Sequence, residues 1–183
     1  MSVTSEIARA RSLIRVVPDH PSPGVAFQDI TPLLADARAL RACVEALVAP
    51  FEGRFDLVAG LEARGFLLAG AAAVLTGTGL VPLRKAGRLP APAARADYTL
   101  EYGTASIEVS EDLRARSRVL LLDDVLATGG TLAAGRRLGR RLQAADQEPD
   151  RLHLHRGVLV GECGEHRVQH LGKGAGAEHG VER

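Results

Sequence analysis

An acidic pair followed by a glycine pair is the part of this 183-residue sequence whose spacing is best suited to chemistry. Asp123 and Asp124 end the apolar run Val119–Leu122, and small residues then lead into a helical segment from Leu132 onward. An apolar run without alternation predicts a buried parallel strand, and open α/β sheets bind ligands at the carboxyl ends of such strands. The small residues leave backbone N–H groups uncovered at a helix N-terminus, which suits a phosphate group. They are Ala127, Thr128, Gly129, Gly130 and Thr131.

The two carboxylates suit acceptance of hydrogen bonds from ribose hydroxyls. No lysine precedes the threonines, so the segment lacks the signature of a P-loop for nucleotide phosphates. The pattern therefore predicts a site for a sugar phosphate. The alternative is an ordinary turn at Gly129 and Gly130, with two solvated acids at the end of a strand.

Five blocks of the sequence, between about Pro21 and Leu142, resemble the type I phosphoribosyltransferases and, within that group, the adenine phosphoribosyltransferases. The blocks are PSPGVAFQDITPLLAD, GLEARGF, PLRKAGRLP, YTLEYGT and VLLLDDVLATGGT. The resemblance implies transfer of phosphoribosyl from phosphoribosyl diphosphate (PRPP) to adenine, giving AMP and pyrophosphate. It also implies that Asp123, Asp124 and the residues from Ala127 to Thr131 bind PRPP, that Mg²⁺ is bound mainly through PRPP with no direct protein ligand expected, and that the protein is a homodimer.

The same resemblance assigns the other site residues. It implies pyrophosphate binding by Arg64, Arg84, Lys85 and Arg88, adenine binding by Ala26, Phe27, Gln28 and Val125, and a catalytic role on the purine for Glu101. It further implies a cis peptide bond between Glu62 and Ala63. Arg88 stands where the family has Lys, and Gln28 stands where Arg is common.

Each of these side chains also has a simpler interpretation. Arg64 could be a solvated helix start, although an Arg there opposes the helix dipole and an anion would explain its presence. Phe27 could be a plain core aromatic, because Phe is more often buried than a platform. Glu101 and the cations from Arg84 to Arg88 could be ordinary surface charges.

Composition limits the classes of partner. The formal charge is +1 and aromatic residues make up 3% of the chain, so neither a basic stripe nor a stacking platform for nucleic acid is expected. No apolar run approaches the roughly 18 residues of a membrane span, and we expect no leader peptide. Cys43 and Cys163 lie in no metal or redox spacing, which fits a reducing compartment. We therefore expect a soluble, cytoplasmic protein with small-molecule substrates.

The order of elements predicts a single α/β domain with a parallel twisted sheet flanked by helices. We expect helices over about 37–51 and 66–75, and strands over 56–61, 79–84, 104–109, 119–122 and near 152–160. Residues 1–35 should form an N-terminal helix and hood. Residues 85–103, which contain Tyr98 and Tyr102, should form a long lid loop without periodicity. Residues 161–183 depart from the family and should be a loosely packed tail that takes no part in chemistry.

Two rival functions remain open at this point. One is a phosphoribosyltransferase for another base, although the lysine-rich lid of orotate enzymes is not found here. The other is a PRPP-sensing regulatory protein of the same fold, which usually has an N-terminal winged helix that residues 1–23 are too short to form.

Overall fold

The computed structural model describes residues 3–100, 103–112, 118–124, 133–135, 137–138 and 154–158. The helices are α1 Val3–Ser12, α2 Thr31–Ala35, α3 Ala37–Val48, the 3₁₀ helix η1 Ala49–Phe51, and α4 Gly65–Thr76. The strands are β1 Arg15–Val17, β2 Phe27–Asp29, β3 Leu57–Leu61, β4 Gly79–Lys85, β5 Ala94–Leu100, β6 Gly103–Val109, β7 Val119–Asp123 and β8 Leu154–Val158. Residues 133–135 and 137–138 are helical as well.

Six of the described strands form one sheet in the order β5-β6-β4-β3-β7-β8. Strands β4, β3, β7 and β8 are parallel, as the sequence predicted, so their carboxyl ends share one edge of the sheet. The sheet as a whole is mixed, because β6 pairs antiparallel with both β4 and β5. The predicted α/β class with parallel central strands is confirmed, and the antiparallel hairpin of β5 and β6 lies at one edge of the sheet.

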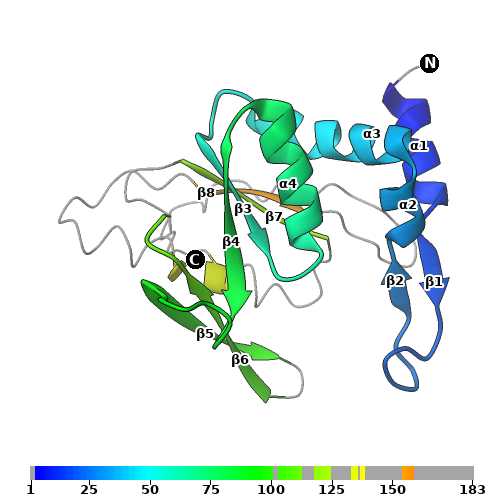
Figure 1. Cartoon of the computed structure of the whole chain (residues 1–183). Coiled ribbons are helices and arrows are strands. Elements are labelled where there is room, and N and C mark those ends of the chain that lie inside the picture. The colour runs from blue at the N-terminus through cyan, green and yellow to red at the C-terminus, as the bar shows by residue number, and fades with distance from the viewer. Residues whose placement is uncertain are drawn as a thin grey trace, which may run out of the picture.

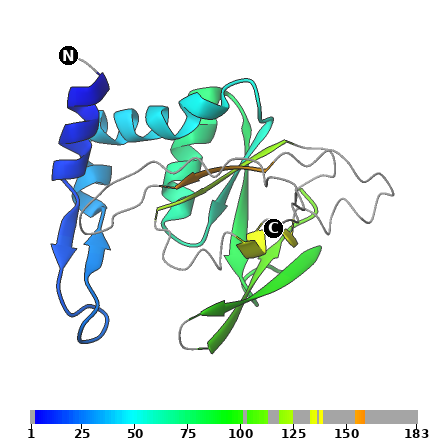
Figure 2. The ribbon, with the colours of Figure 1, turned by 180° about the vertical axis from the view of Figure 1, so that it is seen from behind.

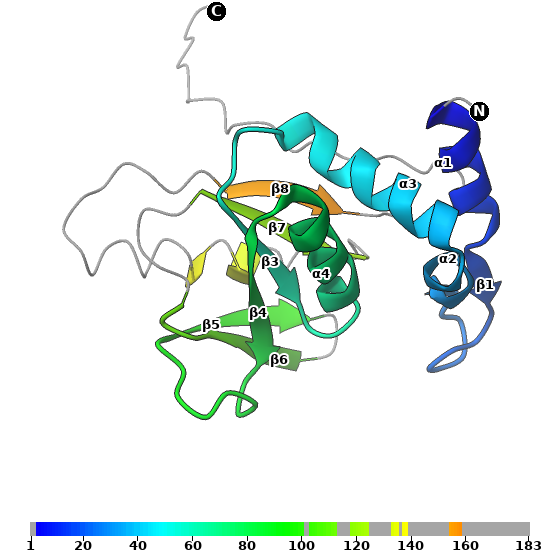
Figure 3. The same cartoon turned by 45° about the horizontal axis from the view of Figure 1, so that its top comes forward.

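Both faces of the sheet are buried, which explains the unbroken apolar runs in its central strands. On one face, Leu120 and Leu122 of β7 pack into a cluster with residues of α3 and α4. On the other face, Val119 and Leu121 pack with β4, β6 and the helical residue Ala134. Figure 1 shows α4 beside β4 and in front of β7, and Figure 3 shows α3 next to α4 above the sheet.

Two glycines allow the start of α4 to approach the sheet closely. A Cβ atom on Gly60 of β3 would lie 2.8 Å from the Cβ of Ala69 and 2.8 Å from the carbonyl oxygen of Gly65. A Cβ atom on Gly65 would lie 2.8 Å from the carbonyl oxygen of Leu122 and 3.2 Å from Oδ1 of Asp123. Since neither position has room for a side chain, the loop before α4 lies directly against the carboxyl end of β7.

The hood, defined here as the described part of residues 1–35, lies to one side of the sheet next to α3 (Figures 1 and 2). Its helix α1 ends at Ser12, and β1 then pairs antiparallel with β2, with Val17 opposite Phe27. The expected N-terminal helix of residues 1–35 is therefore the short helix α1, and Arg15–Val17 form a strand instead. The β-branched pair Val16 and Val17 favours an extended strand.

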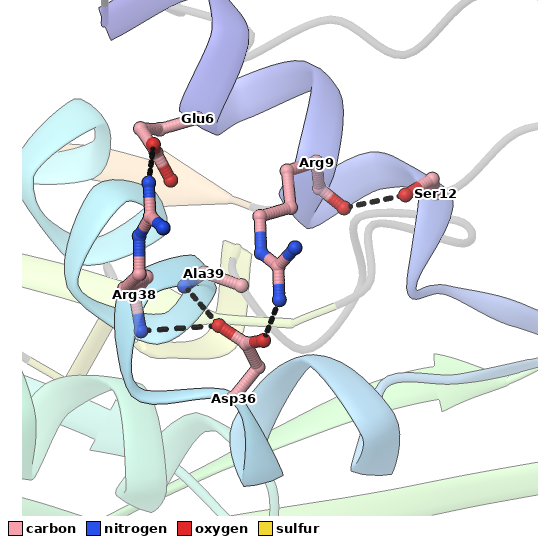
Figure 4. Close-up of polar contacts among 6 residues, drawn as sticks. All are labelled: Glu6, Arg9, Ser12, Asp36, Arg38 and Ala39. Carbon is pink, nitrogen blue, oxygen red and sulfur yellow. Dashed lines mark hydrogen bonds and ion pairs between the residues drawn. The ribbon is translucent and has the colours of Figure 1, made fainter. Parts of the chain in front are cut away.

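Ion pairs join α1 to the beginning of α3 (Figure 4). Arg9 pairs with Asp36, and Arg38 pairs with Glu6. Asp36 also caps α3, because its Oδ1 accepts hydrogen bonds from the backbone N–H groups of Arg38 at 3.1 Å and Ala39 at 2.9 Å. The hydrogen bond from Arg9 holds the pKa of Asp36 below its usual value. The carboxylate therefore stays charged while it both caps α3 and fixes α1.

The expected lid loop contains a regular strand. Residues Ala94–Leu100 form β5, which pairs with β6 from Ala94 opposite Val109 to Leu100 opposite Gly103. Tyr98 is 8% exposed and packs in the core cluster of that side of the sheet. The prediction of an aperiodic loop is therefore wrong for these residues, and Tyr98 is a core residue. Tyr102 and Glu101 lie outside the described residues.

The close packing at Gly60 predicts that a single added methyl group destabilises the folded protein. Gly60→Ala should lower the free energy of unfolding by about 1–3 kcal/mol, because backbone and Ala69 must move to admit the Cβ atom. Thermal melting measures this effect. Gly70→Ala is the matched control in α4, where a Cβ atom would meet only Leu80 Cδ2 at 4.0 Å. This control should leave the melting temperature unchanged or raise it, since Ala favours helix over Gly. Equal melting temperatures for Gly60→Ala and the unsubstituted chain would contradict the packing argument.

Candidate active site

The predicted acidic pair lies at the carboxyl end of β7, in the middle of the parallel part of the sheet. Asp123 is the last residue of the strand and Asp124 follows it, with Asp124 only 5% exposed. The backbone N–H of Asp124 donates to Oδ1 of Asp123 at 2.9 Å. This confirms the predicted strand and the placement of both acids at the ligand-binding edge of an α/β sheet.

Two adjacent carboxylates at a buried position cannot both ionise freely. Burial raises the pKa of Asp123 to about 8, and the neighbouring charge of Asp124 adds to this rise. Asp124 has a cationic partner, since its Oδ2 lies 2.8 Å from Nε of Arg64. Asp123 therefore takes up a proton far more readily than a solvated aspartic acid.

Arg64 connects this acidic pair to the hood. Its Nη1 donates to the backbone carbonyl of Gln28 at 2.9 Å, while its Nε faces Asp124. The guanidinium carbon also lies 4.8 Å from the centroid of the Phe27 ring, in cation–π geometry. One side chain thus contacts residues expected to bind adenine and a residue expected to bind ribose. This excludes the simpler interpretation of Arg64 as a merely solvated helix start.

The hood contributes a half-buried aromatic ring at the same edge. The imidazole of His20 meets the ring of Phe27 edge to face, with the centroids 5.0 Å apart at 81°. Arg64 lies over one face of Phe27. Ala26 is exposed beside it. Phe27 is therefore not a plain core aromatic. His20 was not predicted to lie here, because it directly precedes Pro21 in a proline-rich stretch without periodicity.

A second cluster lies at the carboxyl ends of β3 and β4. It brings together the predicted cations Arg84, Lys85 and Arg88 around Glu62, whose contacts with them were not predicted from the sequence. The peptide bond between Glu62 and Ala63 is cis, as the resemblance implied. The partners of Glu62 lie more than twenty residues further along the chain, with separations of 22 and 23 residues in the hydrogen bonds, so only the fold brings them together.

Several expected site residues lie outside the described part of the chain. These are Val125, Ala127, Thr128, Gly129, Gly130 and Thr131 after the acidic pair, with Glu101 and Tyr102 of the lid. Their roles remain predictions. In the described ranges, no three His, Cys, Asp or Glu side chains converge to hold a metal ion. No helix in those ranges is long and apolar enough to cross a bilayer.

Comparisons with known proteins agree on one family. Curated adenine phosphoribosyltransferases of Renibacterium salmoninarum and Arthrobacter sp. are 59% and 61% identical to this chain over 138 and 131 residues. The matches cover 75% and 71% of this chain, and 74% and 71% of those relatives. The chain belongs to the adenine phosphoribosyltransferase family. No family model matches it.

Solved adenine phosphoribosyltransferases share the fold described above. The enzyme from Rhodothermus marinus matches with a TM-score of 0.72 at 40% identity, over 85% of this chain and 83% of that chain. The enzyme from Saccharomyces cerevisiae matches with a TM-score of 0.76 at 31% identity, over 86% and 89% of the two chains. That crystal structure is a complex with adenine and an imino-altritol bisphosphate.

The raised pKa of Asp123 predicts a pH-dependent stability difference. An acid whose folded-state pKa rises from 3.8 to about 8 favours the folded state at low pH, and this contribution is lost as the pH rises through 8. Asp123→Asn cannot ionise, so it should raise the melting temperature more above pH 8 than at pH 5. Thermal melting without ligand at both pH values measures the difference.

Asp56 provides a control of opposite sign for this experiment. The hydrogen bond from Arg118 lowers the pKa of Asp56 to about 2, so its stabilisation is complete at both pH values. Asp56→Asn should therefore lower the melting temperature slightly and equally at pH 5 and above pH 8. A pH-independent gain for Asp123→Asn would show that Asp123 is ionised in the folded protein throughout this range.

Proposed function

We propose that this chain transfers the phosphoribosyl group of PRPP to adenine, producing AMP and pyrophosphate in purine salvage. The observation that carries the proposal is the position of Arg64, whose guanidinium contacts Phe27, the carbonyl of Gln28 and the carboxylate of Asp124. Residues assigned by family resemblance to the base, the ribose and the pyrophosphate thus meet at one edge of the sheet.

The reaction exchanges one bond at C1 of the ribose for another. The bond from C1 to the pyrophosphate oxygen breaks, a bond from C1 to N9 of adenine forms, and the proton of N9 is lost. The ribose passes through a state with oxocarbenium character, as in glycoside cleavage. The protein must therefore neutralise the leaving pyrophosphate, hold the sugar, and orient the base while its proton is removed.

The sugar and its phosphates are divided between the two clusters. Asp123 and Asp124 accept hydrogen bonds from ribose hydroxyls, and the segment from Ala127 to Thr131 binds the 5′-phosphate through backbone N–H groups. The pyrophosphate is bound by the cationic side chains Arg64, Arg84, Lys85 and Arg88. A guanidinium has five N–H donors, so Arg64 keeps donors for pyrophosphate beside its present contacts with Asp124 and Gln28.

The base is held by the hood. Phe27 stacks on the purine, the backbone of Ala26 and Gln28 reads its edge, and Val125 covers the other face. Glu101 accepts the N9 proton or hydrogen-bonds at N7 while the glycosidic bond forms. Residues 85–103, which include strand β5 and contain Tyr102, act as a lid that excludes water from PRPP.

Mg²⁺ fits the donor set at this edge. It prefers oxygen ligands and commonly binds through substrate phosphates with few protein ligands. Oδ2 of Asp124 is buried and forms an ion pair with Arg64, but it accepts no hydrogen bond from the described residues. Asp123 and Asp124 would hold the ion through water. When bound, Mg²⁺ neutralises charge on the phosphates of PRPP.

The proposal includes a cytoplasmic homodimer. Helix α4 is apolar around its whole circumference, which is typical of a buried helix, yet Leu67 and Val74 are 55% and 86% exposed. Leu80 of β4 is 43% exposed beside it. Burial of these side chains by a second copy would explain their exposure. Light scattering on the purified protein measures the assembly.

The first test of the function is base preference. With PRPP and Mg²⁺, adenine should give a higher kcat/KM than hypoxanthine, guanine or orotate, because the hood and lid blocks match one family. Formation of AMP followed by absorbance measures this preference. Better turnover of another base would favour a phosphoribosyltransferase of different specificity, and PRPP binding without turnover of any base would favour a regulatory protein.

The second test concerns Glu101. Glu101→Gln should lower kcat by about 10²–10⁴, the usual contribution of general acid–base catalysis, while the melting temperature stays the same. Steady-state kinetics with saturating adenine and PRPP measures kcat. A kcat within threefold of the unsubstituted enzyme would show that Glu101 has no such role.

A further inference from the structure

Glu62 is a buried carboxylate that the proposed function leaves without a role. It directly follows β3, and only 7% of its side chain is exposed. Its Oε2 accepts hydrogen bonds from the backbone N–H of Lys85 at 2.7 Å and from Nε of Arg84 at 3.1 Å. Its Oε1 lies 3.1 Å from Nη1 of Arg88. One carboxylate thus joins the end of β3 to the end of β4 and to the turn that follows.

These contacts leave the tips of the cationic side chains available to a ligand. Arg84 donates to Glu62 through Nε, and its terminal nitrogens have no hydrogen bond to a described residue. Arg88 faces the carboxylate with one terminal nitrogen, and Lys85 uses its backbone N–H rather than its ammonium group. The guanidinium carbon of Arg84 also lies 5.9 Å from the ring centroid of Phe66, which restricts it from a second side.

The charge balance of the cluster favours an anion. Although burial acts to raise the pKa of Glu62, the hydrogen bonds from Lys85 and Arg84 hold that pKa below its usual value. The ionised carboxylate offsets part of the repulsion among three neighbouring cations, and the cluster retains excess positive charge. Cations that are already held in place lose less side-chain freedom when they bind an anion than mobile ones do.

We propose that Glu62 is a positioning residue that aligns Arg84, Lys85 and Arg88 so that their free donors meet the leaving pyrophosphate. This inference rests on the proposed function, because it takes pyrophosphate as the ligand of these cations. Two other roles for Glu62 predict different results in the test below. A purely structural contact between β3 and β4 would affect stability without changing pyrophosphate affinity specifically, and an internal competitor for the cations would strengthen anion binding when removed.

Glu62→Gln keeps the size and one acceptor oxygen of the side chain and removes its charge. We expect it to raise the KM for PRPP and the dissociation constant for pyrophosphate by about tenfold, because charge-assisted hydrogen bonds to both arginines are lost. The kcat should stay within threefold and the KM for adenine within twofold. Steady-state kinetics and calorimetry with pyrophosphate and Mg²⁺ measure these values. Unchanged or tighter pyrophosphate binding would overturn the proposal.

Glu108 gives a matched control in the same part of the fold. Its side chain is also buried, and its Oε2 accepts the backbone N–H of Gly87 at 2.9 Å in the turn between Lys85 and Arg88. Glu108→Gln should change pyrophosphate affinity by less than twofold. If both substitutions weaken pyrophosphate binding equally, the effect comes from the shape of the turn, and Glu62 has no role through the arginines.

A variant without the arginines completes the test. In the background Arg84→Ala with Arg88→Ala, adding Glu62→Gln should weaken pyrophosphate binding by less than a further twofold, because both arginine partners of the carboxylate are gone. A full tenfold loss in that background would overturn the proposal. Calorimetry needs no turnover, so a failure of AMP synthesis by the unsubstituted chain would count against the proposed function alone. Lack of pyrophosphate binding by the unsubstituted chain would count against the positioning role itself.

Discussion

The close approach of α4 to the sheet at Gly60 and Gly65 is the constraint on which both halves of the site depend. Gly60 packs against Ala69 and Gly65 against Leu122, and neither glycine has room for a Cβ atom. The loop before α4 therefore lies at the carboxyl ends of β3 and β7. Arg64 and Glu62 are both in this loop. The first therefore reaches Asp124 on one side, and the second reaches Arg84 on the other. A wider separation of helix and sheet would remove both contacts together.

The two clusters have opposite electrostatic designs. At β7, two carboxylates share one guanidinium, and the pKa of Asp123 rises because burial and the second acid outweigh the cation. At β4, three cationic residues surround one carboxylate, whose pKa is lowered. Hydrogen-bond acceptors suit the hydroxyls of a sugar, and excess cations suit a polyanionic leaving group. This division matches the ribose and the pyrophosphate group of PRPP.

The central elements were predictable because their sequence patterns follow from burial alone. The apolar run before Asp123 and the helical stripe of α3 are typical of a two-sided sheet and of a helix packed on it. Strand β5 was missed although its residues alternate, with Ala96 and Tyr98 buried and Arg95 and Asp97 exposed. The prolines upstream of it suggested a loop instead. Three-residue strands such as β1 and β2 carry too few residues to show any periodicity.

Only part of the candidate site could be predicted from the sequence. Residue types and the motif order predicted Asp123 and Asp124, because ligand chemistry restricts which side chains can serve. The cations were predicted through the family resemblance. The contacts that site residues make with other residues of the protein could not be predicted. Glu62 and Arg84 are 22 positions apart, and Gln28 and Arg64 are 36 apart, so only tertiary packing brings them into contact.

The hood is attached to the rest of the protein in two different ways. The ion pairs of Arg9 with Asp36 and of Arg38 with Glu6 are largely exposed on the arginine side, and exposed pairs contribute little stability. Burial of Ala10 and Leu33 in the core cluster supplies most of the attachment on the α3 side. On the substrate side, the described contacts of the hood with the sheet edge converge on Arg64. The position of Phe27 relative to Asp124 thus depends on the same guanidinium that is expected to meet pyrophosphate, so the adenine and PRPP parts of the site are physically linked.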